Sequence, residues 1–164
     1  MSDNLIYAKR IAFELTQRGA LLTTAESCTG GWIAKVLTDL PGSSNWFEYG
    51  FVSYGNNAKH SLLNVSRETL ELEGAVSRAT VKAMILNALN ISAADYGIAV
   101  SGIAGPAGGK KDKPVGTVWL AWGGPSRDLD CECFYFVGDR NQIRYQAVSA
   151  ALKGLLDRIE NNEI

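Results

Sequence analysis

The sequence predicts an α/β fold, with residues 1–164 forming a single three-layer α/β/α domain around a mixed sheet. Two observations predict it. Segments with apolar residues at helical spacing alternate with short apolar runs that are typical of strands. The last two of these runs lie close together and read as an antiparallel hairpin. The composition, with 46% hydrophobic and 20% charged residues, agrees with a packed, soluble domain.

The first elements place a turn of interest early in the chain. Apolar residues recur at helical spacing over residues 5–15, and Gly19 is expected to end this helix. Residues 20–27 ("ALLTTAES") predict a strand, and residues 31–40 ("GWIAKVLTDL") predict a helix that ends before Pro41. Residues 27–31 therefore lie on a strand-to-helix turn, where α/β proteins often bind ligands.

The remaining chain continues the alternation of helices and strands. The elements expected are a short helix at 41–48, a strand at 49–54, helical pieces at 57–63 and 67–73, a longer helix at 77–89 with Ser77 as N-cap, a buried strand at 96–105 that runs into a glycine-rich loop, a hairpin of 116–122 with 129–137, and a final helix at 139–159.

Charge and cysteine content exclude several classes of protein. Sixteen Lys and Arg against 17 Asp and Glu give a net charge of −1, which argues against nucleic-acid binding. The N-terminus lacks the apolar stretch of a signal peptide or membrane span, so we expect a cytoplasmic protein that binds no membrane. The three cysteines, Cys28, Cys131 and Cys133, are not expected to form a disulfide framework, and the last two are expected to be buried on one face of a strand.

Two familiar signals are weak in this sequence. "AGPAGGKK" fails the phosphate-loop pattern because Ala104 replaces a glycine and Lys111 replaces a hydroxyl residue. Its glycines either make a plain turn or bring backbone N–H groups toward an anion. His60 is the only histidine, so no histidine cluster is available to hold a metal, and we expect neither a metal nor an organic cofactor. His60 is more often a surface or core residue than a base.

Seven motifs in order carry a resemblance: "TTAESCTGG", "PGSSNWF", "VSYGNNAK", "LEGAVS", "SGIAGPAGG", "KPVGTVWLA" and "GDRNQIR". Together they resemble the C-terminal domain family of the competence/damage-inducible protein CinA, from about residue 5 to residue 157. The resemblance implies a CinA C-terminal domain-like fold. It also implies hydrolysis of the carboxamide of nicotinamide mononucleotide to nicotinic acid mononucleotide and ammonia, in the pyridine nucleotide cycle of NAD biosynthesis, without a metal and by a Ser-Lys mechanism.

The resemblance maps the dyad to Ser44 and Lys59, with Tyr54 beside them and Ser27 as a supporting hydroxyl. Lys59 is flanked by uncharged residues, so partial burial would depress its pKa and leave it neutral enough to act as a base. The choice between Ser44 and Ser27 stays open, because both start helices whose N–H groups could stabilise an oxyanion. Cys28 has no partner that would form a thiolate pair, and we expect it to serve packing.

Several further residues are candidates for binding the nucleotide. Thr29, Gly30 and Gly31 are expected to shape the pocket. Ser101 and Gly102, at a strand end, are placed to bind the carboxamide or ribose. Arg140 and Arg144 share one helix face, and the resemblance favours phosphate binding by them.

Departures from the family pattern leave alternatives open. The family usually has serine where Gly55 stands, glutamate where Asn57 stands and often threonine at Ser101. Gly55 favours, as the main alternative, a non-catalytic nucleotide-binding or interaction module that keeps the pocket. A broader amidase or a metal-dependent pyrophosphatase-like enzyme is a second alternative. Aromatic residues in "NWFEYG" could form the interface of a homo-oligomer.

Overall fold

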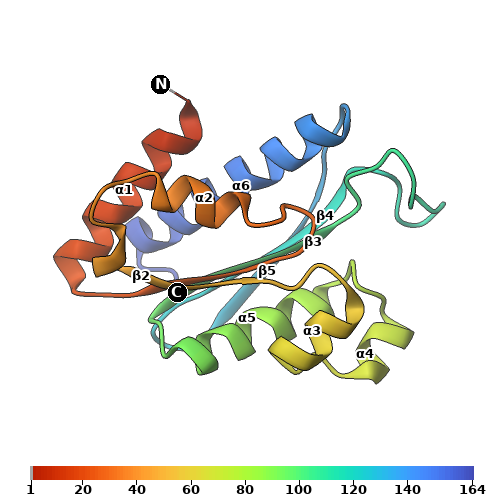
Figure 1. Cartoon of the computed structure of the whole chain (residues 1–164), viewed down its shortest axis with the longest axis horizontal. Coiled ribbons are helices and arrows are strands. Elements are labelled where there is room, and N and C mark those ends of the chain that lie inside the picture. Colours follow the sequence, from red (N-terminus) through yellow and green to blue (C-terminus); the bar gives the residue numbers. More distant parts are fainter. Residues whose placement is uncertain (1) are drawn as a thin grey trace.

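A five-stranded mixed sheet with strand order β2-β1-β3-β4-β5 forms the centre of the molecule (Figure 1). The computed structural model describes residues 2–164. β1 pairs in parallel with both β2 and β3, whereas β3, β4 and β5 are antiparallel. In chain order the elements are α1 (Asp3–Arg18), β1 (Leu22–Glu26), α2 (Trp32–Thr38), the 3₁₀ helix η1 (Ser43–Asn45), β2 (Phe47–Val52), α3 (Asn56–Leu63), α4 (Arg67–Leu72), α5 (Arg78–Ser92), β3 (Tyr96–Gly102), β4 (Thr117–Gly123), β5 (Leu129–Tyr135) and α6 (Arg140–Asn161).

Helices cover both faces of the sheet, which confirms the predicted three-layer α/β/α arrangement. α1, α2 and α6 lie on one face, and α3, α4 and α5 lie on the other (Figure 1). Each face has its own hydrophobic core. Ile11, Ile33 and Leu152 belong to the first core, and Val81 and Leu89 to the second.

Local chemistry fixes the helix ends where the sequence predicts them. Gly19 ends α1 in the left-handed conformation with φ of 59°. Ser77 caps α5 by accepting a hydrogen bond from the Thr80 N–H, and Asp139 forms a capping box with Gln142 at the start of α6. These caps satisfy N–H groups that have no partner within their own helix.

Two expectations about side-chain burial are corrected. Cys131 and Cys133 are only half-buried, because β5 is an edge strand of the sheet. Trp46, proposed for a subunit interface, is 4% exposed and packs in the core of the α1, α2 and α6 face. Tyr49 is exposed at 42% and stacks on Phe51, so the aromatic surface at this edge comes from β2 itself.

Strand direction decides which residues meet at each edge of the sheet. β1, β2 and β3 run the same way, so their carboxyl ends share one edge. Ser27 follows β1, Ser53 and Tyr54 follow β2, and Ser101 lies near the end of β3. η1, which contains Ser44, precedes β2 and lies at the opposite edge. Within residues 2–164, no helix has the length and apolar character needed to cross a membrane.

Candidate active site

A cavity of about 270 Å³ opens at the carboxyl edge of the parallel strands. Five segments that are distant in sequence line it, which makes it a product of the tertiary fold. They are Ser27 and Cys28 after β1, Tyr54 and Lys59 around the start of α3, Ala75 and Val76 before α5, residues 101–105 with Ala107 and Gly108 from β3 and the loop after it, and Arg140 at the start of α6. Crevices at this edge of an α/β sheet are the usual location of ligand sites.

The amine of Lys59 contacts the hydroxyl of Ser27 at the base of this cavity. Lys59 Nζ donates to Ser27 Oγ at 2.9 Å, to the Ser53 carbonyl at 2.8 Å and to the Tyr54 carbonyl at 2.9 Å. The side chain is 1% exposed, and within residues 2–164 it forms no ion pair with a carboxylate. Three acceptors therefore match the three N–H groups of the charged amine.

Burial gives this amine the protonation behaviour of a base. Burial lowers the pKa of Lys59 from 10.5 to about 8, because the interior disfavours the charged form. A neutral amine can keep two N–H bonds to the Ser53 and Tyr54 carbonyls and offer its lone pair to the Ser27 hydroxyl. The arrangement thus allows proton transfer from Ser27 to Lys59.

Helix α3 carries Lys59 to this position. Lys59 and Leu63 are its buried residues, and they lie four apart on its inner face. Gly55 precedes the helix, and a Cβ at Gly55 would meet no atom within 4 Å. A serine would therefore fit here and would lie at the helix N-cap, a position that serine favours.

The expected pair of Ser44 and Lys59 is not formed. Ser44 is exposed, lies in η1 and does not line the cavity. Leu22 pairs with Phe47 and Glu26 with Val52, so Ser44 and Ser27 lie at opposite ends of neighbouring strands. At about 3.3 Å per residue, the five residues from Leu22 to Ser27 alone span roughly 16 Å. The structure places Ser27, not Ser44, beside the amine.

A buried carboxylate holds the turn that follows Ser27. Glu26 is fully buried and accepts hydrogen bonds from Thr29 Oγ1 at 2.6 Å and from the N–H groups of Ile33 and Ala34 at 2.8 and 3.1 Å. Burial raises the pKa of this carboxyl, and the hydrogen bonds oppose that rise. Glu26 thus caps α2 from within the protein. Sequence reasoning missed this role, because Glu26 lies six residues before the first residue of α2 and outside the usual N-cap position.

The turn residues support the cavity from behind. Thr29 is fully buried against Glu26, and Gly30 and Gly31 adopt φ of 61° and 94°. Glycine reaches this left-handed region without strain, which lets the chain turn sharply after Ser27. None of the three is among the residues that line the cavity.

Cys28 has the environment of a packing residue. It is 6% exposed, and burial raises the pKa of its thiol to about 12. A thiol is a strong nucleophile only as the thiolate, and this site disfavours that form.

We expect Cys28→Ala to keep most of any reaction rate that depends on Ser27 and Lys59, and to lower thermal stability modestly through the small cavity left behind. Rate measurements and a thermal melt check both expectations. Iodoacetamide treatment of the wild-type protein should likewise leave the rate nearly unchanged. A rate loss comparable to that of a Ser27 variant would assign the chemistry to the thiol.

The two arginines of α6 have different surroundings. Arg140 lines the cavity and donates to the Gly105 carbonyl at 2.6 Å and to the Tyr54 hydroxyl at 2.8 Å. Arg144 donates to the Cys28 and Thr29 carbonyls at 3.0 and 3.1 Å and does not line the cavity. Arg144 therefore braces the turn after Ser27.

Of the remaining candidates, some line the cavity and others lie outside it. Ser101 is 1% exposed and lines the cavity together with Gly102. A Cβ on Gly102 would lie 2.6 Å from Val118 Cγ2, so strand packing requires glycine there. His60 Nδ1 pairs with the Val65 carbonyl at 2.9 Å and lies outside the cavity lining. Within residues 2–164, no three His, Cys, Asp or Glu side chains are grouped as ligands for a metal ion.

Comparison with known proteins identifies the family that has this architecture. The model of the CinA C-terminal domain matches residues 5–159, nearly the whole chain. The chain belongs to the CinA C-terminal domain family. A curated relative from Escherichia coli K12, named nicotinamide-nucleotide amidohydrolase PncC, is 47% identical over 98% of both chains. A relative of the same name from Pseudomonas putida is 51% identical and covers 91% of this chain and 92% of its own.

Solved structures of the CinA family share the fold closely. The competence/damage-inducible protein CihA from Agrobacterium tumefaciens has a TM-score of 0.93 at 42% identity and covers 98% of this chain and 97% of its own. The competence damage-inducible protein A from Klebsiella pneumoniae also has a TM-score of 0.93, at 37% identity, with coverage of 97% and 98%. The mixed sheet is thus the CinA C-terminal arrangement.

Proposed function

We propose that this chain hydrolyses the carboxamide of nicotinamide mononucleotide to nicotinic acid mononucleotide and ammonia, with Ser27 as nucleophile and Lys59 as base. The observation that carries the mechanism is the 2.9 Å contact between Lys59 Nζ and Ser27 Oγ at the base of the cavity. The names of the relatives, which cover almost the whole chain, support the substrate.

The reaction proceeds in two halves that use the same pair. Neutral Lys59 takes the proton of Ser27 Oγ as this oxygen bonds to the carboxamide carbon. The resulting tetrahedral species collapses when the C–N bond breaks and the Lys59 ammonium gives its proton to the leaving ammonia. Water then attacks the Ser27 ester, Lys59 accepts a proton from it, and the proton returns to Ser27 as the carboxylic acid is released. Neither half requires a metal ion or an organic cofactor.

Stabilisation of the oxyanion comes from the turn after the nucleophile. The Cys28 N–H follows Ser27 directly, and Cys28 lines the cavity. We assign this N–H to the developing negative charge, a role that backbone donors fill in many acyl-transfer enzymes. Glu26, Thr29 and Arg144 hold the turn rigid through the contacts described above, so the donor is oriented before the substrate binds.

Release of ammonia from nicotinamide mononucleotide by the purified protein tests the proposal, measured with and without EDTA. We expect steady release in both conditions. Binding of the nucleotide with no release would favour the non-catalytic module instead. Strong inhibition by EDTA would favour metal-dependent chemistry.

Arg140 is the arginine that we assign to substrate binding. Two of its N–H groups are engaged by Gly105 and Tyr54, which leaves others for a ligand in the cavity. Tyr54, held by Arg140, forms the adjacent wall, and Ser101 is available to the carboxamide or ribose.

We expect Arg140→Ala to raise KM for nicotinamide mononucleotide about ten- to hundredfold, because a charge-assisted hydrogen bond contributes roughly 1.5–3 kcal/mol. Arg144→Ala is the matched comparison on the same helix face. It should act through the turn after Ser27 and lower kcat or stability instead. Steady-state kinetics of both variants distinguish the two roles, and an unchanged KM in Arg140→Ala would contradict this assignment.

We further propose that residues 1–164 act as one domain in the cytoplasm. Cys28, Cys131 and Cys133 are all free thiols, which fits a reducing compartment.

A further inference from the structure

A second cavity of about 190 Å³ adjoins the one that contains Ser27. The two share Ala75, Val76, Ile103 and Gly108 in their linings, so they adjoin each other along this wall. The lining of the second cavity is completed by Gly74, Lys110 and Lys113. A ligand that presents its carboxamide to Ser27 can therefore extend past the shared apolar wall toward two lysines.

The backbone places these two lysines side by side. The Lys110 N–H donates to the Lys113 carbonyl at 2.8 Å, and the Lys113 N–H donates to the Lys110 carbonyl at 3.2 Å. Residues that exchange both bonds stand directly opposite each other, with their side chains on the same face. Like charges in such a pair destabilise it. An anion bound between the two ammonium groups would remove this repulsion.

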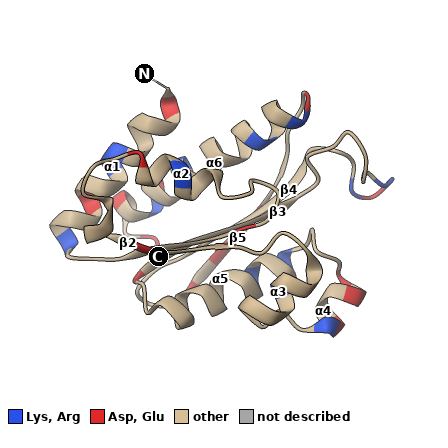
Figure 2. Ribbon diagram, in the orientation of Figure 1, with Lys and Arg blue, Asp and Glu red and all other residues tan. Residues whose placement is uncertain are grey.

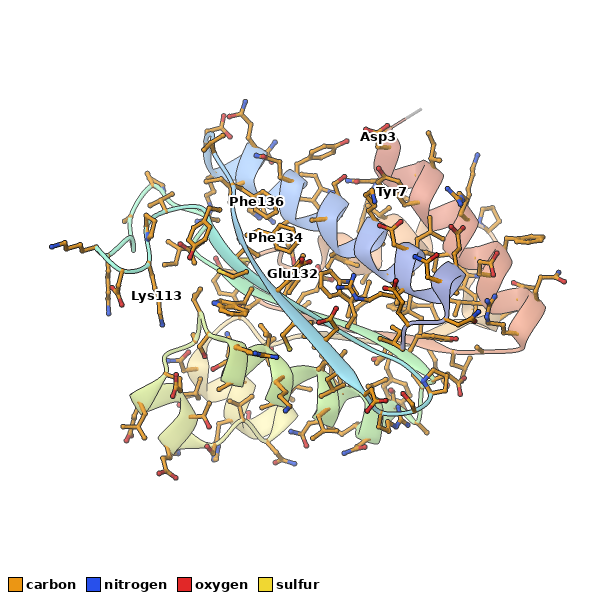
Figure 3. All side chains as sticks on the ribbon, turned by 180° about the vertical axis from the view of Figure 1, so that it is seen from behind. Asp3, Tyr7, Lys113, Glu132, Phe134 and Phe136 are labelled. Atoms are coloured by element: carbon orange, nitrogen blue, oxygen red, sulfur yellow. The ribbon has the colours of Figure 1, made fainter. Side chains whose placement is uncertain are left out.

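The amine of Lys113 is already held over the cavity. Lys113 Nζ donates to the Glu73 carbonyl at 2.8 Å, which ties the β3–β4 loop to the segment before α5. Figure 3 shows this side chain extending from the loop toward the face of the sheet that α3, α4 and α5 cover. One hydrogen bond leaves two N–H groups of the ammonium for a ligand.

No acidic residue lines this second cavity within the described residues 2–164. The tip of the β3–β4 loop carries both charge signs (Figure 2). Its acidic member, Asp112, lies between Lys111 and Lys113 at the turn and is not part of the lining. Lys111 is also outside the lining. The side of the loop that faces the cavity is therefore cationic.

We propose that Lys110 and Lys113 bind the phosphate group of the nucleotide whose carboxamide lies at Ser27. This inference rests on the proposed function and completes it: Ala75, Val76 and Ile103 face the body of the substrate, and the lysine pair holds its dianionic end. Arg140, tied to Gly105 and Tyr54, then contacts the sugar or ring.

The test compares two substrates that differ only in the phosphate, nicotinamide mononucleotide and nicotinamide riboside. The variant is Lys110→Gln with Lys113→Gln, since glutamine at 113 keeps a donor for the Glu73 carbonyl and removes the charge. We expect the ratio of KM for the nucleotide to KM for the nucleoside to rise about ten- to hundredfold. Lys111→Gln, which removes an equal charge from the same loop, should leave this ratio at the wild-type value.

Calorimetry with Ser27→Ala protein separates this proposal from the enzymatic one, because it needs no turnover. Nicotinamide mononucleotide should bind Ser27→Ala about ten- to hundredfold more tightly than it binds the same protein with both glutamines. Weaker binding would support the phosphate site even if wild-type protein released no ammonia. Equal binding would overturn it, as would an equal effect of Lys111→Gln. A selective loss of nucleotide binding in Arg140→Ala alone would move the phosphate to Arg140.

Discussion

Ser27→Ala is expected to abolish the release of ammonia from nicotinamide mononucleotide, whereas Ser44→Ala should keep a rate close to that of the wild type. Ser27 Oγ lies 2.9 Å from Lys59 Nζ and lines the cavity, and Ser44 is exposed at the far edge of the sheet. Loss of the nucleophile in serine hydrolases lowers kcat by a factor of about 10⁴ or more. Steady-state ammonia release by both variants measures the difference.

Two controls make this comparison decisive. The far-ultraviolet spectrum of Ser27→Ala should match that of the wild type, and its melting temperature should fall only modestly, because the substitution leaves one N–H of the buried Lys59 amine without its acceptor. Calorimetric binding of the nucleotide should persist, since only the nucleophile is missing. The opposite pattern, with Ser44→Ala inactive and Ser27→Ala active, would return the nucleophile to Ser44.

Lys59→Met should lower kcat by at least about 10²- to 10⁴-fold, the usual contribution of a general base. Methionine fills much of the buried volume but cannot accept a proton. Because Ser27 and Lys59 act as one unit, the double variant Ser27→Ala/Lys59→Met should be no slower than the slower of the two single variants. Lys59→Arg is a stringent comparison: it keeps a charge and donors, yet guanidinium does not deprotonate in proteins, so it should also be inactive.

The pH dependence of the wild type follows from the protonation of Lys59. Activity requires the neutral amine, so kcat/KM should rise with pH through about 8, the pKa to which burial lowers this group. A rate that is constant from mildly acidic to alkaline pH would contradict a lysine base.

The free energy of unfolding should also depend on the ionisation of Lys59, and the direction of its change with pH follows from the lowered pKa. The folded protein releases the Lys59 proton at a pH of about 8, whereas the unfolded chain holds it up to 10.5. Between these values the unfolded state binds more protons, so the free energy of unfolding rises with pH. Relative to Lys59→Met, the wild type should gain roughly 3 kcal/mol over this window. Denaturant melts of both proteins at pH 7.5 and 10.5 measure the gain, and no relative change would mean that Lys59 titrates normally.

Much of the fold could be predicted because its signals are local. Gly19 ends α1 through its own backbone freedom, and Ser77 caps α5 through an N–H only three residues away. The late hairpin pairs Thr117 with Tyr135 and Gly123 with Leu129, as two apolar runs joined by a short link predict. The burial of Cys131 was predicted less well, because strand periodicity does not reveal which strand lies at an edge.

Part of the candidate site could be predicted from the same local signals. Ser27 ends one predicted strand, Lys59 follows another, and Ser44 precedes that second strand. If those strands are parallel neighbours, their carboxyl ends meet and Ser44 is left at the other edge. Strand pairing was the missing information, since residues 27 and 59 meet only through the ladder between β1 and β2.

The sequence by itself determined the order of helices and strands, the membership in the CinA family and the small set of hydroxyls and cations from which a site could be made. Only the tertiary structure decided which of these residues line the cavity and which support it from outside. Arg140 and Arg144 share a helix face, yet one lines the cavity and the other braces the turn after Ser27. The pKa of Lys59 is lowered because packing leaves its side chain only 1% exposed. Burial and contacts between distant segments arise only when the sheet and helices pack together. The local sequence around a residue therefore does not reveal them.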